Sequence, residues 1–263
     1  MKHSTRRFLP LLLIASCAAG PAATPSSTPA YPPTSSYETR QLNGWTLHLS
    51  GDFASSPANL ALRDRVLELL SAELLDVSRA VPPPAYEKLR GVPVWIEVNE
   101  RGFRAMCYHP SAEWLSAHGY NPDKAGGIEI CHADEFLTWT IDQPWMALHE
   151  LAHAYHHQVL GFDNPEVAAA HAAAVASHKY DAVMYINGRK VRHYALENPQ
   201  EFFAESSEAF FGTNDFYPFV RAELREFDPD TYRLMQKLWG TQRRATPRAA
   251  SGPTSRPVQQ VRP

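Results

Sequence analysis

The chain has 263 residues, 44% of them hydrophobic and 20% charged, so it can bury a folded core and is too apolar for a disordered protein. Its formal net charge of −3 is uneven, because residues 1–36 and 241–263 contain basic residues but no acids. The part between them, 37–240, has 17 Lys and Arg against 28 Asp and Glu, a net charge of −11. Such an acidic body repels phosphate backbones, so we expect no nucleic-acid partner.

The first residues are typical of an export signal. Basic residues precede an apolar run at 8–15 that is too short to span a bilayer as a mature helix. The run ends in Ile14-Ala15-Ser16-Cys17, which resembles a bacterial lipobox. That resemblance implies a signal peptide over 1–16, lipidation of Cys17, and anchoring to a membrane of the bacterial cell envelope. An ordinary secretory signal cut near Gly20 is the alternative, and it also predicts export.

Composition divides the rest of the chain into a tether, a folded body and a tail. Residues 17–36 are rich in Pro, Ser, Thr and Ala, which cannot form a core, so we expect a disordered tether. Residues 241–263 contain five arginines and no acid, and they predict a disordered basic tail. The folded domain is expected over 37–240, as a monomer.

Strand and helix patterns mix along the body, which predicts an α+β fold. Strands are expected at 45–50, 92–98 and 127–131, and a hairpin at 182–194 around an Asn187-Gly188 turn. Helices are expected at 59–81, 111–118, 145–160, 164–179, 198–212, 218–227 and 229–239. The predicted architecture is a small mixed sheet, a central helix that carries the chemistry, and a mostly helical C-terminal part.

Cys107 and Cys131 remain as a pair if Cys17 is lipidated. In an oxidising compartment the pair predicts a disulfide, which would stabilise the fold by about 3 kcal/mol. Two buried free thiols are the alternative. Their spacing lacks a C-x-x-C pair and gives little support for a metal site.

The sequence His149-Glu150-Leu151-Ala152-His153 is an H-E-x-x-H motif inside the predicted 145–160 helix. Histidines four residues apart lie on the same face of a helix, so both can bind one Zn²⁺ ion. Glu150 lies next to that face and can act as a general base toward a zinc-activated water. The motif therefore predicts a hydrolase with a single zinc ion.

The motif does not identify the third zinc ligand. The spacings of metzincins and of thermolysin-like enzymes do not fit, because the expected positions carry no histidine or glutamate. The best remaining acids are Glu201, Glu205 and Glu208, which recur on one face of the predicted 198–212 helix. Glu201 also has a rival role, because it can form a capping box with Asn198.

A family resemblance selects among these acids. The segment Asn198-Pro-Gln-Glu-Phe-Phe-Ala-Glu205, with Tyr194 seven residues before Glu201, resembles the gluzincin metallopeptidases. It is most similar to the group that contains the anthrax lethal factor catalytic domain and the Pro-Pro endopeptidases, and the likeness covers about residues 127–209. The resemblance implies a zincin-like fold with His149, His153 and Glu201 as zinc ligands, Glu150 as base and Tyr194 facing the metal.

Neighbouring residues receive supporting roles. Glu205 is placed one turn after Glu201, where it can orient a ligand histidine, and Tyr194 can donate to a developing oxyanion unless it is only a packed strand residue. We expect three further histidines to serve packing or the surface; these are His156, His157 and His193. The strand 127–131 is a candidate edge for binding an extended peptide, as zincins commonly do.

These features predict an exported, lipid-anchored zinc endopeptidase that hydrolyses protein or peptide substrates. One alternative is a binding module that keeps the zincin fold and its metal without catalysis. Another is a zinc amidase that acts on a non-protein or cell-wall bond with the same residues. A purely structural zinc site needs neither Glu150 nor Tyr194, which favours an enzyme.

Overall fold

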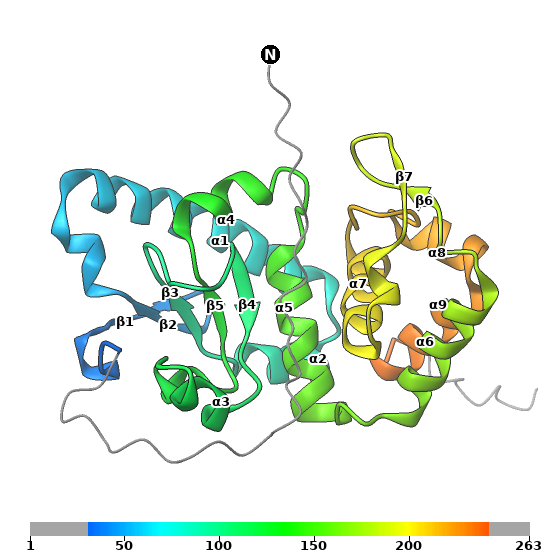
Figure 1. Ribbon diagram of the computed structural model, residues 1–263, viewed down its shortest axis with the longest axis horizontal. Coiled ribbons are helices and arrows are strands. Elements are labelled where there is room, and N and C mark those ends of the chain that lie inside the picture. Colours follow the sequence, from blue (N-terminus) through cyan, green and yellow to red (C-terminus); the bar gives the residue numbers. More distant parts are fainter. Residues whose placement is uncertain (1–30, 242–263) are drawn as a thin grey trace, which may run out of the picture.

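The computed structural model describes residues 31–241, which form a mixed α+β fold (Figure 1). The sheet and its helices lie on one side of the central helix α5 (Met146–Tyr155), and the helices α6 to α9 lie on the other. The predicted signal segment 1–16, Cys17 and residues 242–263 of the predicted tail lie outside the described residues. Within residues 31–241, no helix is both long and apolar enough to cross a bilayer.

Each predicted helix is present, with ends within a few residues of those expected. The helices are α1 (Pro57–Ala80), α2 (Pro83–Arg90), α3 (Ala112–Ala117), α4 (Ala133–Trp139), α5, α6 (Pro165–Ser177), α7 (Pro199–Phe211), α8 (Arg221–Phe227) and α9 (Pro229–Leu238). The strands are β1 (Glu38–Leu42), β2 (Trp45–Leu49), β3 (Val94–Ile96), β4 (Met106–Tyr108), β5 (Ile128–Ile130), β6 (Val183–Met184) and β7 (Lys190–Val191). The prediction did not include α2, α4, β1 or β4.

Five strands form one sheet in the order β1-β2-β3-β5-β4. The β2–β3 and β3–β5 pairs are parallel, whereas β1–β2 and β4–β5 are antiparallel. The prediction that 127–131 is an edge strand is therefore wrong. β5 lies inside the sheet because the three-residue β4 pairs with it, Met106 opposite Ile130, and β4 is the edge strand beside α5.

The hairpin of β1 and β2 turns at Asn43-Gly44. Both residues have positive φ, 51° and 89°, as a type I′ turn requires. Gly44 therefore tolerates a conformation that side chains disfavour. The same Asn-Gly signal correctly predicts the β6–β7 turn, where Gly188 has φ 83°.

The two faces of the sheet differ in chemistry because side chains alternate along each strand. Residues such as Val94, Ile96 and Ile130 join the main apolar core with α1 and α5. The other face carries Glu129, which is fully buried, and beside it the ammonium of Lys124. This face therefore combines buried ion pairs with the aromatic packing of Trp95 against Tyr37 and His48.

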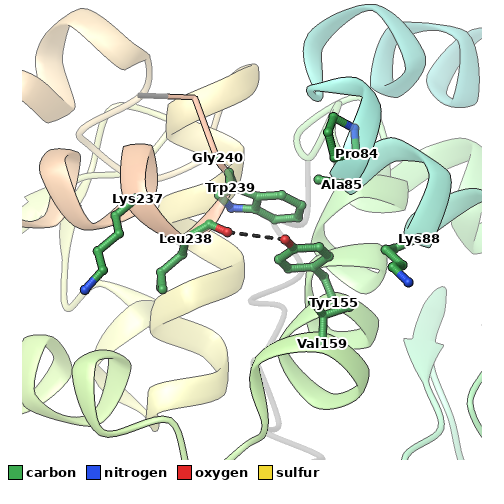
Figure 2. A pocket seen from close by; sticks show the side chains of 9 residues that line it. All are labelled: Pro84, Ala85, Lys88, Tyr155, Val159, Lys237, Leu238, Trp239 and Gly240. Atoms are coloured by element: carbon green, nitrogen blue, oxygen red, sulfur yellow. Dashed lines mark hydrogen bonds between the residues drawn. The ribbon is translucent and has the colours of Figure 1, made fainter. Parts of the chain in front are cut away.

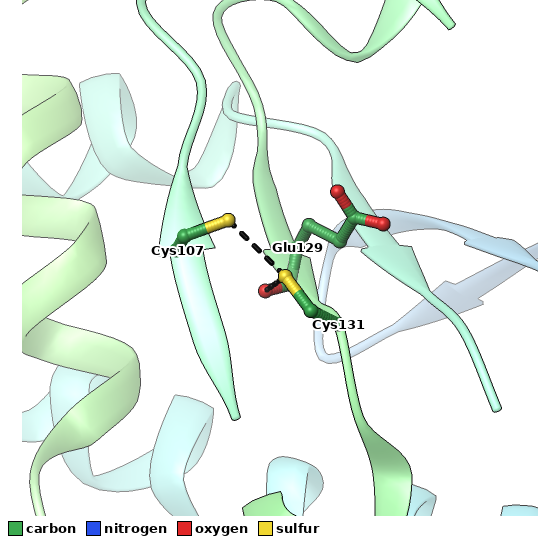
Figure 3. Close-up of side chains that lie close together, drawn as sticks. All are labelled: Cys107, Glu129 and Cys131. Atoms are coloured by element: carbon green, nitrogen blue, oxygen red, sulfur yellow. Dashed lines mark hydrogen bonds between the residues drawn. The ribbon is translucent and has the colours of Figure 1, made fainter. Parts of the chain in front are cut away.

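Cys107 and Cys131 lie on the polar face at β4 and just beyond β5 (Figure 3). Their Sγ atoms are 3.1 Å apart, well beyond the disulfide bond length of about 2.05 Å, and both residues are free thiols. The expected disulfide is therefore not formed in this structure; both thiols are free, but only Cys131 is buried.

Two predicted boundaries shift. Thr34, in the predicted tether, belongs to a 3₁₀ turn, and its hydroxyl donates to Asp123 Oδ2 at 2.5 Å. The second strand of the hairpin was expected to reach Tyr194 but ends at Val191. Tyr194 instead begins a 3₁₀ turn, Tyr194–Leu196, directly before α7.

Candidate metal centre

Helix α5 presents the motif histidines toward α7, its main packing partner. Leu148, Leu151 and Ala152 bury the other sides of α5 in the core, which fixes how the helix is rotated. After Tyr155 the helix continues as one π-helical turn, His156–Leu160, and Gly161 ends it with φ 83°. Because the core sets the orientation of α5, both His149 and His153 face the same neighbour.

Helix α7 supplies the carboxylate. Asn198 caps it by accepting a hydrogen bond from the Glu201 backbone N–H at 2.8 Å, and Pro199 occupies the first turn. The Glu201 side chain does not return to the cap but points at the histidines, with the residue only 3% exposed. Glu201 therefore takes part in the cap only through its backbone N–H. Its carboxylate is free to contact the histidines.

Three side-chain atoms from α5 and α7 converge. Glu201 Oε2 lies 3.1 Å from His149 Nε2 and 3.4 Å from His153 Nε2, and the two nitrogens are 3.1 Å apart. A tetrahedral zinc ion with bonds of about 2.0–2.1 Å separates its N and O ligands by about 3.3 Å. The three distances are close to the edges of such a tetrahedron, so this ligand set fits a zinc ion with little movement.

The charges of these groups reinforce one another. Burial alone would raise the pKa of Glu201, but the imidazoles of His153 and His149 outweigh it and lower that pKa far below its ordinary value. Burial alone would lower the pKa of His149, but hydrogen bonds with Glu201 and Glu208 raise it well above normal. Glu201 is therefore an ionised carboxylate, as a metal ligand must be.

Glu208 holds the outer nitrogen of His149. His149 Nδ1 is 2.6 Å from Glu208 Oε1 but 3.7 Å from Glu205 Oε1. The orienting role that sequence reasoning gave to Glu205 is thus filled by Glu208, two turns after Glu201, whereas Glu205 accepts a hydrogen bond from Asn214 at 2.9 Å. A carboxylate behind a ligand histidine fixes its ring and makes it a stronger ligand.

Further buried acids lie behind this pair. Glu73 of α1 accepts a hydrogen bond from the Ala147 backbone N–H at 3.1 Å, and burial raises its pKa to about 8. Burial, together with the charge of Glu208, raises the pKa of Asp215 to about 7. Neither residue was predicted. The position of Glu73 within the apolar stripe of the 59–81 helix could have indicated a buried acid. No sequence feature indicates that Asp215 is buried.

Glu150 and Tyr194 border the same site. Glu150 is partly exposed beside His149. Tyr194 is partly buried, and its burial raises its pKa, as do the negative charges of Glu201, Glu205 and, last, Glu150. The phenol therefore stays protonated and can act as a donor at neutral pH. The structure thus brings His149, His153 and Glu201 together, and Tyr194 lies close enough to Glu201 and Glu150 for their charges to affect its phenol.

Two of the three histidines expected to lie outside the zinc site, His156 and His193, serve packing. His156 is fully buried between the rings of Phe162 and Phe203, and burial lowers its pKa to about 4. His193 accepts a hydrogen bond from the Ala195 backbone N–H at 3.1 Å and stacks on Phe216.

A cavity of about 290 Å³ lies near the C-terminal end of α5, where Tyr155 donates to the Leu238 carbonyl at 3.3 Å (Figure 2). Its lining contains no histidine or carboxylate side chain, so it offers no metal chemistry.

No protein-family model, curated protein or solved structure matches this chain. Its function is therefore proposed below from the chemistry of the site itself.

Proposed function

We propose that the protein is a zinc-dependent endopeptidase of the zincin type. The observation that carries the proposal is the convergence of His149 Nε2, His153 Nε2 and Glu201 Oε2 at 3.1–3.4 Å from one another. Three protein ligands leave a fourth position free, which is the pattern of catalytic rather than structural zinc sites. A zinc ion held there would supply Lewis-acid chemistry, acidifying a water and polarising the substrate carbonyl.

The remaining chemistry belongs to the chain. Glu150, on α5 beside His149, is the base that accepts the proton of the attacking water and later returns it to the leaving amine. Tyr194 donates its phenolic proton in a hydrogen bond to the oxygen that becomes negative. Glu208 keeps the His149 ring in place through Nδ1 at 2.6 Å. Glu150 and Tyr194 favour an enzyme over a module in which the metal serves only stability.

The test combines metal analysis with turnover. The purified full-length protein should contain about one zinc ion per chain and cleave peptides in a library digest. Glu150→Gln should keep the zinc and lower turnover by at least about 100-fold, because the general base is removed. Glu166→Gln, a surface glutamate paired with Lys237 on α9, is the matched control and should leave turnover unchanged.

Absence of zinc would overturn the whole proposal, and full turnover in Glu150→Gln would overturn the assigned base. If zinc is present but only a cell-wall amide is cleaved, the enzyme is an amidase rather than a peptidase.

We also propose that the protein is exported and anchored to a membrane through Cys17. The support is the lipobox-like segment, Ile14-Ala15-Ser16-Cys17, which follows a short apolar run. Cys17→Ser should move the protein from the membrane fraction to the soluble fraction. Unchanged fractionation would contradict lipidation at this residue.

A further inference from the structure

Cys107 and Cys131 have unequal surroundings although their sulfurs lie 3.1 Å apart. Cys107 is on the edge strand β4 and is partly exposed, whereas Cys131 is fully buried beyond the end of β5. Figure 3 shows the two sulfurs pointing toward each other across the strands. Of the two residues, Cys107 retains some solvent exposure and Cys131 has none.

His109 gives Cys107 a positively charged neighbour. It lies two residues further along, on the same face, with Nε2 3.5 Å from Cys107 Sγ and in contact with Glu129 Oε2. Lys124 Nζ donates a hydrogen bond to the other oxygen of Glu129, Oε1, at 2.5 Å. Glu97 and Glu100 are the remaining charged groups of this cluster, and both contact Lys124 rather than the thiols. The imidazole is therefore held in place by a buried carboxylate.

The protonation of the three groups follows from these contacts. Burial would lower the pKa of His109, but Cys107 and Glu129 raise it to about 10, so the imidazole is charged at neutral pH. Burial would raise the pKa of Cys107, but the hydrogen bond with Cys131 and the nearby His109 lower it. Burial and the adjacent Cys107 raise the pKa of Cys131 well above normal. Of the two thiols, Cys107 is therefore the one that loses its proton more readily.

We propose that Cys107 is a peroxide-reactive thiolate, with His109 as its activating cation and Cys131 as the thiol that resolves the product. This combination of a partly exposed thiolate, a fixed cation and an adjacent second thiol is typical of redox-responsive cysteines. A permanent structural disulfide requires no such asymmetry between its two cysteines. The inference does not depend on zinc, because none of these side chains belongs to the His149 site.

The reaction proceeds in two balanced steps. The Cys107 sulfur attacks one oxygen of hydrogen peroxide and the O–O bond breaks. The departing oxygen leaves as water after taking up a proton, equivalent to the one that the Cys107 thiol gave up on ionising. Cys107 is thereby oxidised to a sulfenic acid. The Cys131 sulfur then attacks the Cys107 sulfur, the S–O bond breaks, and the oxygen leaves as water with the Cys131 proton. In total, two thiols and one peroxide give one disulfide and two waters.

Labelling tests the two roles separately. The chain has three cysteines, so Cys17→Ser is included in each full-length variant to leave only this pair. After treatment with hydrogen peroxide, Cys131→Ser should accumulate a sulfenic acid on Cys107, detected by mass spectrometry after trapping with dimedone. Cys107→Ser should show no such label on Cys131. A label on Cys131, or none on Cys107, would overturn the assignment.

The pH profile of alkylation tests the activating cation. Cys107 in the Cys131→Ser background should react with iodoacetamide with a midpoint below that of an ordinary cysteine thiol. His109→Gln should shift that midpoint upward, because the cation is removed. His118→Gln, an exposed histidine that stacks on Trp114, is the matched control and should leave the midpoint unchanged. Equal midpoints with and without His109 would overturn the proposal, and so would a midpoint at the ordinary value.

Discussion

Two groups of buried charged side chains flank the sheet and α5, and their charges are balanced in different ways. On the polar face of the sheet, the ammonium of Lys124 is 1% exposed and contacts three carboxylates at 2.5–2.9 Å. Between α5 and α7, the charged partners that contact the carboxylates of Glu201 and Glu208 are imidazoles. Glu208 Oε2 is buried there without a hydrogen-bond partner, and so is Oε1 of Glu73, which reaches the start of α5 from α1.

The difference separates a structural ion-pair cluster from a site suited to a ligand. A lysine is a permanent cation at neutral pH, so the first group is complete in itself. Imidazoles can give up their protons and bind a metal ion instead, so the second group can exchange protons for a divalent cation. Removing Lys124 should therefore lower the folding stability of the protein. Removing a side chain of the second group should instead lower its affinity for the metal.

The largest expected effect is on zinc binding at the second group. Glu201→Ala removes one of the three proposed zinc ligands, so saturating zinc should no longer raise the melting temperature. In the wild-type chain, zinc at 1,000 times its dissociation constant would add about 4 kcal/mol of stability. Thermal unfolding with and without zinc measures this difference. An equal zinc-induced shift in the variant would show that Glu201 is not a ligand.

The next effect concerns folding of the first group. Lys124→Met leaves Glu97, Glu100 and Glu129 without their ammonium partner, and breaking a buried charge network of this kind costs about 3–5 kcal/mol. Urea unfolding measures the loss, which should be the same with and without zinc.

Lys190→Met, on the exposed strand β7, is the control and should change stability by less than about 0.5 kcal/mol. An equal effect of the two substitutions would mean that the Lys124 cluster contributes no more than surface charge.

A smaller effect distinguishes the acids behind His149. Glu208→Gln keeps the shape of the side chain but removes the charge at 2.6 Å from His149 Nδ1, so zinc affinity should fall about 10-fold. Glu205→Gln, at 3.7 Å, should lower it less than about 3-fold. Competition with a chromophoric chelator measures both dissociation constants. The opposite order would restore Glu205 as the orienting residue.

The sequence predicted the two groups unequally for physical reasons. The helices that carry His149, His153 and Glu201 have long apolar stripes and a clear cap at Asn198, so their positions could be predicted. The three-residue β4 has too few residues for a periodic signal, and without β4 the sequence predicts β5 as the edge strand. The choice of Glu208 over Glu205 depends on how α7 is rotated against α5, which only tertiary packing determines. The Lys124 cluster joins segments that are distant in sequence, so no local sequence pattern predicts it.

Glu73 gives the last prediction, a change of stability with pH. Its pKa is about 8 in the folded protein and about 4.3 when unfolded, so between these values only the folded state retains the proton. Stability should therefore decrease as pH rises through this window, by up to about 1.4 kcal/mol per pH unit from this group, and this penalty is absent at lower pH. Glu73→Gln cannot ionise, so its free energy of unfolding should fall less steeply than that of the wild type between about pH 5 and about pH 8. Urea unfolding across that range, with Glu68→Gln on the exposed side of α1 as control, measures the two slopes. Parallel curves for wild type and Glu73→Gln would show that Glu73 is ionised in the folded protein. The group of acids behind His149 would then carry one more negative charge than expected from the burial of Glu73, whose Oε1 has no hydrogen-bond partner.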